Sequence, residues 1–247
     1  MKNQLNDMKL LNKTILITGA SSGIGCETAL VCSREGAKVI ITGRDENRLN
    51  ETFKQLEGEG HLIFAADLYH FQDIVNLVTE CPTLDGIVHS AGITAHMPVN
   101  FINQQHLNTI MKINFEAPVL LTSMLLNKKK INNQASIVFV SSIATKLAYF
   151  GGAIYTASKS ALESYAKSLS LELSQKKIRS NVIAPTFVKT KMVDETEKTI
   201  SPESLERMKS LHPFGFGEPH DVASAVLYFL SDESAWVSGA KLEMGGI

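Results

Sequence analysis

The chain has 247 residues, of which 44% are hydrophobic and 20% are charged. A chain of this length can bury one full core, so we expect a single domain over residues 1–247, and the charged fraction argues against a membrane-embedded protein. Its 24 Lys and Arg nearly balance 25 Asp and Glu, and the net charge of -1 argues against a broad basic surface for nucleic acid or anionic lipid.

Short β-branched, apolar runs alternate with longer stretches of helical periodicity. The predicted strands are, in chain order, Thr14–Thr18, Lys38–Thr42, Leu62–Ala65, Gly86–His89, Ser136–Ser141, Arg179–Ile183 and Ala240–Met244. The predicted helices between them include Ile24–Arg34, Glu46–Leu56, Gln104–Leu126, Ala153–Ser174 and His220–Leu230. This alternation indicates an α/β fold: a Rossmann-like, doubly wound parallel sheet of about seven strands with helices on both faces. Ligands bind such sheets at the carboxyl ends of the strands.

The turn after the first strand is rich in glycine and serine and reads Gly19-Ala20-Ser21-Ser22-Gly23-Ile24-Gly25. Glycine permits positive φ and lets a phosphate approach the backbone, and a helix start offers free N–H groups and a positive dipole end to a diphosphate. The spacing Gly-x-x-x-Gly-x-Gly differs from the commoner Gly-x-Gly-x-x-Gly. We interpret the turn as a dinucleotide site; the alternative is a tight strand-to-helix turn that binds nothing.

The second strand leads into Thr42-Gly43-Arg44, where many dinucleotide-binding folds place an acid that binds the adenosine ribose. The missing carboxylate and the added guanidinium favour a 2′-phosphate, and therefore NADP(H) over NAD(H). The alternative is that Arg44 is an ordinary surface arginine paired with Asp45. Asp67, just past the third strand, fits either a hydrogen bond to the adenine amino group or a cap for the following helix.

The fifth strand ends in Ser141-Ser142, and Tyr155-Thr156-Ala157-Ser158-Lys159 follows on a predicted helix. Residues four apart share one face of a helix, so Lys159 lies beside Tyr155. An ammonium lowers the pKa of a nearby phenol from its usual value near 10, and a serine hydroxyl can stabilise charge on a carbonyl oxygen. This combination predicts proton transfer by Tyr155 coupled to hydride transfer by a nicotinamide. The alternative is a chance packing pair on a partly exposed helix.

These features together resemble the short-chain dehydrogenase/reductase family over essentially the whole chain. The motifs that carry the resemblance are Thr18 through Gly25, Ser90-Ala91-Gly92, Asn114, Ser142, Tyr155-x-x-x-Lys159, and Pro185 with Thr190. The resemblance implies an enzyme that interconverts a carbonyl and a secondary alcohol, with the catalytic set Asn114, Ser142, Tyr155 and Lys159. It implies cofactor contacts from Gly19, Ser21, Ser22, Gly23, Ile24, Gly25, Arg44, Asp67, Ala91, Gly92, Tyr155, Lys159, Pro185, Val188 and Thr190.

Within this resemblance, Asn114 holds a water that links Lys159 to solvent, and its alternative role is to stabilise a kink in its own helix. Two positions depart from the family pattern. The usual Asn-Asn-Ala-Gly is replaced by His89-Ser90-Ala91-Gly92, so that His89 either takes over the hydrogen bonds of the first Asn or loses them. The usual Pro-Gly after the sixth strand is replaced by Pro185-Thr186, which removes backbone freedom near the nicotinamide. Neither position belongs to the proton-transfer set.

The substrate pocket is expected in the loops beyond the strands, with an apolar lining that includes Phe150, Phe187, Met192 and Phe214. The polar stretch Met192–Ser210 is expected to act as a lid. Two lysine groups, Lys128–Lys130 and Lys176–Lys177, are similar to the basic residues that meet the acidic acyl carrier protein in the family's 3-oxoacyl-[acyl-carrier-protein] reductases. The alternative is that these lysines are solvated residues at helix ends.

The resemblance also implies a homodimer or homotetramer built on the two long helices. Two other functions are weighed against an active reductase. The first is a nicotinamide-binding sensor or scaffold without turnover, against which the intact catalytic set argues. The second is a sugar epimerase or dehydratase of the same fold, which usually carries a longer C-terminal substrate domain.

The N-terminus and the cysteines bear on location. Met1–Lys13 is polar and lacks the apolar core of a signal peptide, and we expect no membrane span. Cys26, Cys32 and Cys81 are an odd number without paired spacing, so a reducing cytoplasm is expected rather than a disulfide framework. We also expect no metal site.

Overall fold

Seven strands form one parallel sheet in the order β3-β2-β1-β4-β5-β6-β7 in the computed structural model, which describes residues 8–94, 96–190, 203, 206, 210 and 212–246. The strands are β1 (Thr14–Thr18), β2 (Lys38–Gly43), β3 (Leu62–Ala65), β4 (Leu84–His89), β5 (Ile131–Val140), β6 (Arg179–Pro185) and β7 (Lys241–Met244). The predicted fold class is confirmed. Two strands, β4 and β5, begin earlier in the chain than their apolar runs predict.

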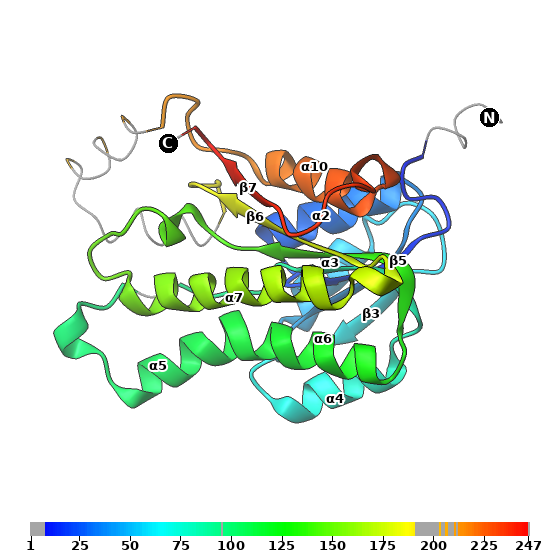
Figure 1. The fold of residues 1–247 in the computed structure, drawn as a ribbon, viewed down its shortest axis with the longest axis horizontal. Helices are drawn as coiled ribbons and strands as arrows, with labels where there is room; N and C mark the ends of the chain where they lie inside the picture. Colours follow the sequence, from blue (N-terminus) through cyan, green and yellow to red (C-terminus); the bar gives the residue numbers. More distant parts are fainter. Residues whose placement is uncertain are drawn as a thin grey trace.

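Helices cover both faces of the sheet (Figure 1). They are α2 (Gly23–Arg34), α3 (Glu46–Phe53), α4 (Phe71–Glu80), α5 (Gln104–Met111), α6 (Ala117–Asn127), α7 (Ala153–Glu172) and α10 (Pro219–Leu230). The helix α4 is absent from the predicted ranges. It buries Ile74, Leu77 and Val78, but His70 before it offers no side-chain cap, so the sequence lacks a clear start signal there.

Alternating strand residues supply two core layers. Ile15 and Ile17 of β1 belong to the cluster shared with α2 and α10, and Leu16 between them belongs to the cluster shared with α4, α6 and α7. Successive side chains of a strand point to opposite faces, so each strand must be apolar throughout to fill both layers. The sheet is thereby held between two helical layers, which fixes the ends of its strands.

The order of the strands reverses direction between β1 and β4. The chain leaves β1 through α2 toward β2, and it leaves β4 through α5 and α6 toward β5, on the other face of the sheet. The two connections diverge and open a crevice at the carboxyl ends of these strands. Thr18, the last residue of β1, joins the two sides of this crevice. The Thr18 hydroxyl accepts hydrogen bonds from the backbone N–H of Ser90 (3.2 Å) and of Ala91 (3.1 Å).

The helical run Gln104–Asn127 is long and apolar enough to span a membrane by length and composition alone. It contains a π-helical turn, Lys112–Glu116, between α5 and α6. Leu121 and Leu125 of α6 are fully buried in the same core cluster as the residues of α4 and α7. The run is therefore a core helix of this sheet.

Arg179 joins the start of β6 to the end of α10. It is 8% exposed, and its guanidinium donates to the carbonyls of Phe229 (2.8 Å) and Ser231 (3.1 Å) and to the hydroxyl of Ser234 (2.7 Å). The carbonyls at the end of a helix lack partners within it. One cation therefore satisfies a group of buried acceptors.

We expect Arg179→Met to lower the free energy of unfolding by about 2–4 kcal/mol, because it removes three hydrogen bonds that a buried guanidinium donates to buried acceptors. The control is Arg34→Met, because Arg34 is 48% exposed and forms ion pairs with Glu27 and Glu57. Its expected cost is below about 1 kcal/mol. Urea unfolding of both variants measures the difference, and equal costs would contradict this role of Arg179.

Candidate active site

The glycine turn packs too closely against its surroundings to accept side chains. Gly19 has a φ of +69°, and a Cβ there would lie 2.8 Å from the Cα and N atoms of Ala91. A Cβ on Gly25 would collide with the carbonyl of Gly19. Ser22, which precedes α2, makes no capping hydrogen bond with its side chain. The first N–H groups of α2 therefore remain available to an anion beside a closely packed backbone.

A cavity of about 390 Å³ runs along this turn. Its lining joins the glycine turn to the ends of β2 and β3 and to the loop after β4, and it includes Gly19, Ser21, Ser22, Gly23, Ile24, Gly25, Arg44, Arg48, Asp67, Ala91, Gly92 and Thr190. Most of the sequence-predicted cofactor residues therefore meet in one cleft. Its size and its glycine-lined wall fit a dinucleotide.

Arg44 lies in this cleft, and its neighbour Asp45 has another partner. The Asp45 carboxylate caps α3 by accepting from the Arg48 backbone N–H (3.1 Å), and it pairs with the Arg48 side chain (2.5 Å). A Cβ on Gly43 would lie 3.2 Å from the Ser21 hydroxyl oxygen. Ser21 thus takes the space in which an acidic side chain at position 43 would stand. Arg48 is absent from the predicted site residues, although it follows Arg44 by four residues and lines the same cleft.

Asp67 lies between the cleft and the turn before α4. It lines the cleft, and its carboxylate accepts a hydrogen bond from the backbone N–H of Tyr69 (3.0 Å). Its own backbone N–H donates to Asp73 (2.9 Å) in the first turn of α4. His70 occupies the N-cap position of α4 without a capping side-chain hydrogen bond, so the predicted helix-cap role of Asp67 is wrong and Asp67 supports the turn before the helix.

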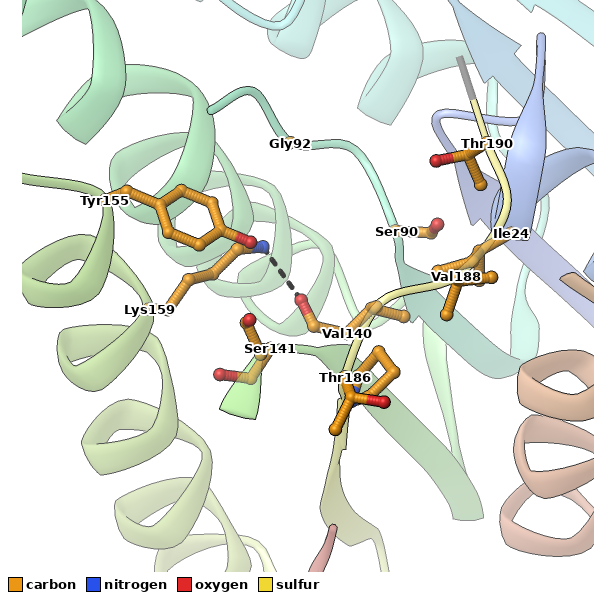
Figure 2. A pocket seen from close by; sticks show the side chains of 12 residues that line it. Ile24, Ser90, Gly92, Val140, Ser141, Tyr155, Lys159, Thr186, Val188 and Thr190 are labelled. Carbon is orange, nitrogen blue, oxygen red and sulfur yellow. Dashed lines mark hydrogen bonds between the residues drawn. The ribbon is translucent and has the colours of Figure 1, made fainter. Parts of the chain in front are cut away.

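A second cavity of about 110 Å³ continues from the first, and the two share Ile24, Ser90, Gly92 and Thr190. Figure 2 shows Tyr155 and Lys159 reaching into it from α7, opposite the end of β5 and the segment after β6. Ser142, Pro185, Val188 and Thr186 also line it. Sequence-predicted residues from four separate parts of the chain are therefore brought together at one edge of the sheet.

Lys159 is buried, and its ammonium donates to the carbonyl of Val140 (2.9 Å; Figure 2). The same nitrogen lies 5.9 Å from the centre of the Tyr155 ring. A Cβ on Gly92 would lie 3.2 Å from this nitrogen, so glycine leaves room for the ammonium. The predicted face-sharing of Tyr155 and Lys159 is found, and a backbone carbonyl orients the cation.

Burial dominates the ionisation of both groups. It raises the pKa of the Tyr155 phenol to about 12, although a hydrogen bond from Ser142 lowers it. It lowers the pKa of Lys159 to about 8, while the charge of Glu163 raises it. The predicted lowering of the Tyr155 pKa is therefore wrong, because loss of hydration favours the neutral form of each group and sets the direction of both shifts.

Asn114 is fully buried in the π-helical turn. Its side-chain oxygen accepts from the backbone N–H of Ile93 (2.9 Å). Its nitrogen donates to the carbonyl of Ile93 (2.9 Å) and to the hydroxyl of Ser158 (3.0 Å). Asn114 therefore ties the loop after β4 to α7 beside Lys159, and it lies at the helix irregularity that its alternative role requires.

The two departures from the family pattern have different surroundings. His89 turns away from the cleft: its Nε2 bonds to the Thr122 hydroxyl (2.8 Å), its ring stacks on Phe139 at 4.8 Å, and burial lowers its pKa to about 3. It therefore hydrogen-bonds as a neutral ring to α6. Thr186 lines the smaller cavity, and its backbone N–H donates to the Met244 carbonyl (3.0 Å). This tie holds the segment after β6 to β7.

The predicted substrate loops are partly described. Phe150 is 86% exposed and Phe214 is 83% exposed, whereas Phe187 packs with His212 and Phe216 at ring distances of 5.3 and 5.5 Å. Phe187 thus forms part of an aromatic cluster. Met192 lies outside the described residues, as does most of the expected lid Met192–Ser210.

The predicted basic residues lie at the amino ends of the strands, opposite the end that forms the cleft. Lys128–Lys130 precede β5 and Lys176–Lys177 precede β6, so both groups stand at amino ends of strands. Lys130 is also held by the carbonyls of Thr79 (2.8 Å) and Cys81 (2.5 Å). Within one subunit these lysines are remote from the cleft, which lies at the carboxyl ends.

The sequence matches the short chain dehydrogenase family over residues 13–201. It is 32% identical to the 3-oxoacyl-[acyl-carrier-protein] reductase FabG of Rickettsia felis, over 96% of this chain and 97% of that protein. It is 30% identical to the FabG reductase of Thermotoga maritima, over 97% and 98%. A solved structure of a short chain dehydrogenase/reductase family protein matches with a TM-score of 0.84 at 27% identity, over 97% of this chain and 98% of that one. The chain therefore belongs to the short-chain dehydrogenase/reductase family of NAD(P)-dependent oxidoreductases.

Proposed function

We propose that this protein is an NADP(H)-dependent oxidoreductase that interconverts a carbonyl and a secondary alcohol, with Tyr155 as general acid and base. The observation that carries the proposal is the continuity of the two cavities. Tyr155, Lys159 and Ser142 line one end, and the glycine turn and Arg44 line the other. A dinucleotide laid along this cleft with its diphosphate at the glycine turn would reach the Tyr155 side chain with its nicotinamide end.

The bound nicotinamide supplies or accepts the hydride. The chain's own residues manage the proton. In the reductive direction the Ser142 hydroxyl holds the carbonyl oxygen and Tyr155 donates its proton to that oxygen. The Lys159 ammonium stabilises the phenolate that remains, and Asn114 ties Ile93, which follows Gly92, to Ser158, which precedes Lys159.

Among carbonyl substrates, we propose 3-oxoacyl thioesters first. The support is that the Rickettsia felis and Thermotoga maritima relatives, which align over nearly their whole lengths, carry the name of reductases for such substrates. The exposed Phe150 and Phe214 offer apolar surface for an acyl chain. The lysine groups give no support within one subunit, so the thioester proposal does not depend on them.

We also propose a homodimer or homotetramer. Trp236 is 100% exposed and Leu171, near the end of α7, is 77% exposed. Large apolar side chains of this kind are commonly buried at subunit interfaces.

We expect Tyr155→Phe to lower kcat for NADPH-dependent reduction of an acetoacetyl thioester by at least ~10³-fold, because the only group lost is the proton donor. The loss of NADPH absorbance measures turnover, and quenching of protein fluorescence measures cofactor binding, which we expect to persist. Tyr228→Phe is the control, since Tyr228 is 40% exposed and lies on α10.

The sensor or scaffold alternative makes the opposite prediction for the unmodified protein. It requires tight NADPH binding without turnover of any substrate in a panel of ketones, aldehydes and 3-oxoacyl thioesters. That result would contradict the proposed reductase. Turnover of simple ketones without turnover of thioesters would keep the reductase and remove the thioester substrate.

We expect Arg44→Ala to raise the Michaelis constant for NADPH by about 10–100-fold and to leave that for NADH within about twofold, because a charge-assisted contact to the 2′-phosphate is lost. Initial rates with both cofactors measure this, with Arg34→Ala as the control far from the cleft. A preference of the unmodified protein for NADH would contradict the assignment of Arg44.

We expect kcat for reduction to fall as pH rises through about 8. The pKa of Lys159 lies below its ordinary value, so the ammonium is present below pH 8 and is lost above it. Without the ammonium, the phenolate formed when Tyr155 gives up its proton is no longer stabilised. A pH profile at saturating substrate measures the effect, and a rate that stays flat to about pH 9, roughly one pH unit above the pKa of Lys159, would contradict it.

A further inference from the structure

We infer that Glu163 is a positioning residue for the proton-transfer site: it fixes the turn that carries Ser142, ties that turn to β7 through Lys241, and supplies the negative charge that faces Lys159. This inference rests on the proposed function for its catalytic meaning. The contacts themselves are properties of the fold. Neither the glycine turn nor the Tyr155–Lys159 motif points to it.

The Glu163 carboxylate lies beneath the turn that follows β5. One of its oxygens accepts hydrogen bonds from the hydroxyls of Ser141 (2.7 Å) and Thr145 (2.9 Å). These two residues flank Ser142, whose hydroxyl accepts from the backbone N–H of Ala144 (3.2 Å). A carboxylate that bonds both sides of a turn holds its backbone in one conformation. The direction of the Ser142 hydroxyl toward Tyr155 is set by that backbone.

The other oxygen of Glu163 pairs with the ammonium of Lys241 (3.1 Å), the first residue of β7. Lys241 also donates to the Thr145 hydroxyl (2.8 Å). The network continues from Lys241 to Glu243 (3.6 Å) and from Glu243 to Lys146 (2.8 Å), which returns to the same turn. The turn after β5 is therefore tied to the last strand of the sheet by two lysines.

The charge of Glu163 also acts on Lys159. The two residues are four apart on α7, so they share one face of the helix. The Glu163 side chain is 19% exposed and Lys159 is buried, so solvent screens their interaction less than it would screen a surface pair. The Glu163 charge raises the pKa of Lys159 against the lowering by burial.

The ionisable groups around this pair come from several elements. Lys159 faces Tyr155 and Glu163 on its own helix, the Val140 carbonyl of β5, and the Asn114 amide near Gly92. Tyr149, from the loop before α7, acts on Tyr155 and raises its pKa. On the other side, Glu163 faces Lys241 of β7. Glu163 thus lies between a buried lysine that it supports and a surface lysine that partly neutralises it.

The test separates charge from hydrogen bonding. Glu163→Gln keeps an acceptor for Ser141 and Thr145 but removes the charge, and Lys241→Met removes the partner that neutralises Glu163. Glu172→Gln is the matched control, because it removes an exposed carboxylate from the end of the same helix. Protein labelled with ¹³C-lysine is titrated by NMR without cofactor or substrate, and Lys159→Arg assigns the Lys159 signal.

We expect the Lys159 titration midpoint to fall by roughly one pH unit in Glu163→Gln, to rise in Lys241→Met, and to stay unchanged in Glu172→Gln. The alkaline limb of the kcat profile for reduction should move by the same amount. The Glu163→Gln variant should therefore lose about tenfold in kcat above the new midpoint and regain most of it at lower pH.

An unmoved Lys159 midpoint in Glu163→Gln would overturn the inference, as would a loss of kcat that is equal at every pH, since that marks a purely structural role. If Glu163→Gln does not fold, the Lys159 midpoint in Lys241→Met becomes the test. A Lys159 midpoint that falls or stays unchanged in that variant overturns the inference. If the midpoints move as expected but the unmodified protein reduces no carbonyl, the proposed function fails and the coupling of Glu163 to Lys159 stands.

Discussion

The burial of one ammonium group governs the arrangement of this site. Lys159 has lost most of its hydration, and a buried cation without partners would lose its proton. The Val140 carbonyl, at the end of β5, provides a direct acceptor, and the Glu163 carboxylate one turn further along α7 provides the opposing charge. These partners come from the sheet and from the helix, so the position of the charge depends on how α7 packs on β5.

The same packing explains why the neighbouring backbone has little freedom. Gly92 leaves room for the ammonium, and Gly19 lets the first turn approach the loop that carries Gly92. Thr18 binds that loop through two backbone N–H groups. The nucleotide half of the cleft and the proton-transfer half are thus joined by close backbone contacts at the switch point of the sheet, and a shift in either half would move the other.

Sequence patterns predicted those features that depend on residues close together in the chain. The strand–helix alternation, the glycine turn and the spacing of Tyr155 and Lys159 depend on residues near each other in sequence, and each is found. The predicted lowering of the Tyr155 pKa is wrong, because the pKa is raised by burial. Burial depends on residues from distant parts of the chain that pack around the phenol. His89 bonds to Thr122 on α6, a contact between positions that no spacing rule connects. The proximity of Glu163 to Lys159 could have been predicted, since Glu163 follows Lys159 by four residues. Its ion pair with Lys241 could not, because Lys241 belongs to the last strand.

The last strand therefore has more than one role in this fold. β7 is an edge strand that pairs with β6, and it contacts the catalytic half at two places. Lys241 reaches Glu163 and Thr145, and the Met244 carbonyl accepts from the Thr186 backbone N–H. Thr186 stands where the family usually has glycine, and a Cβ on Gly245 would collide with its side chain. The added threonine side chain and the missing one at position 245 fit each other, so β7 and the glycine that follows it accommodate the departure after β6.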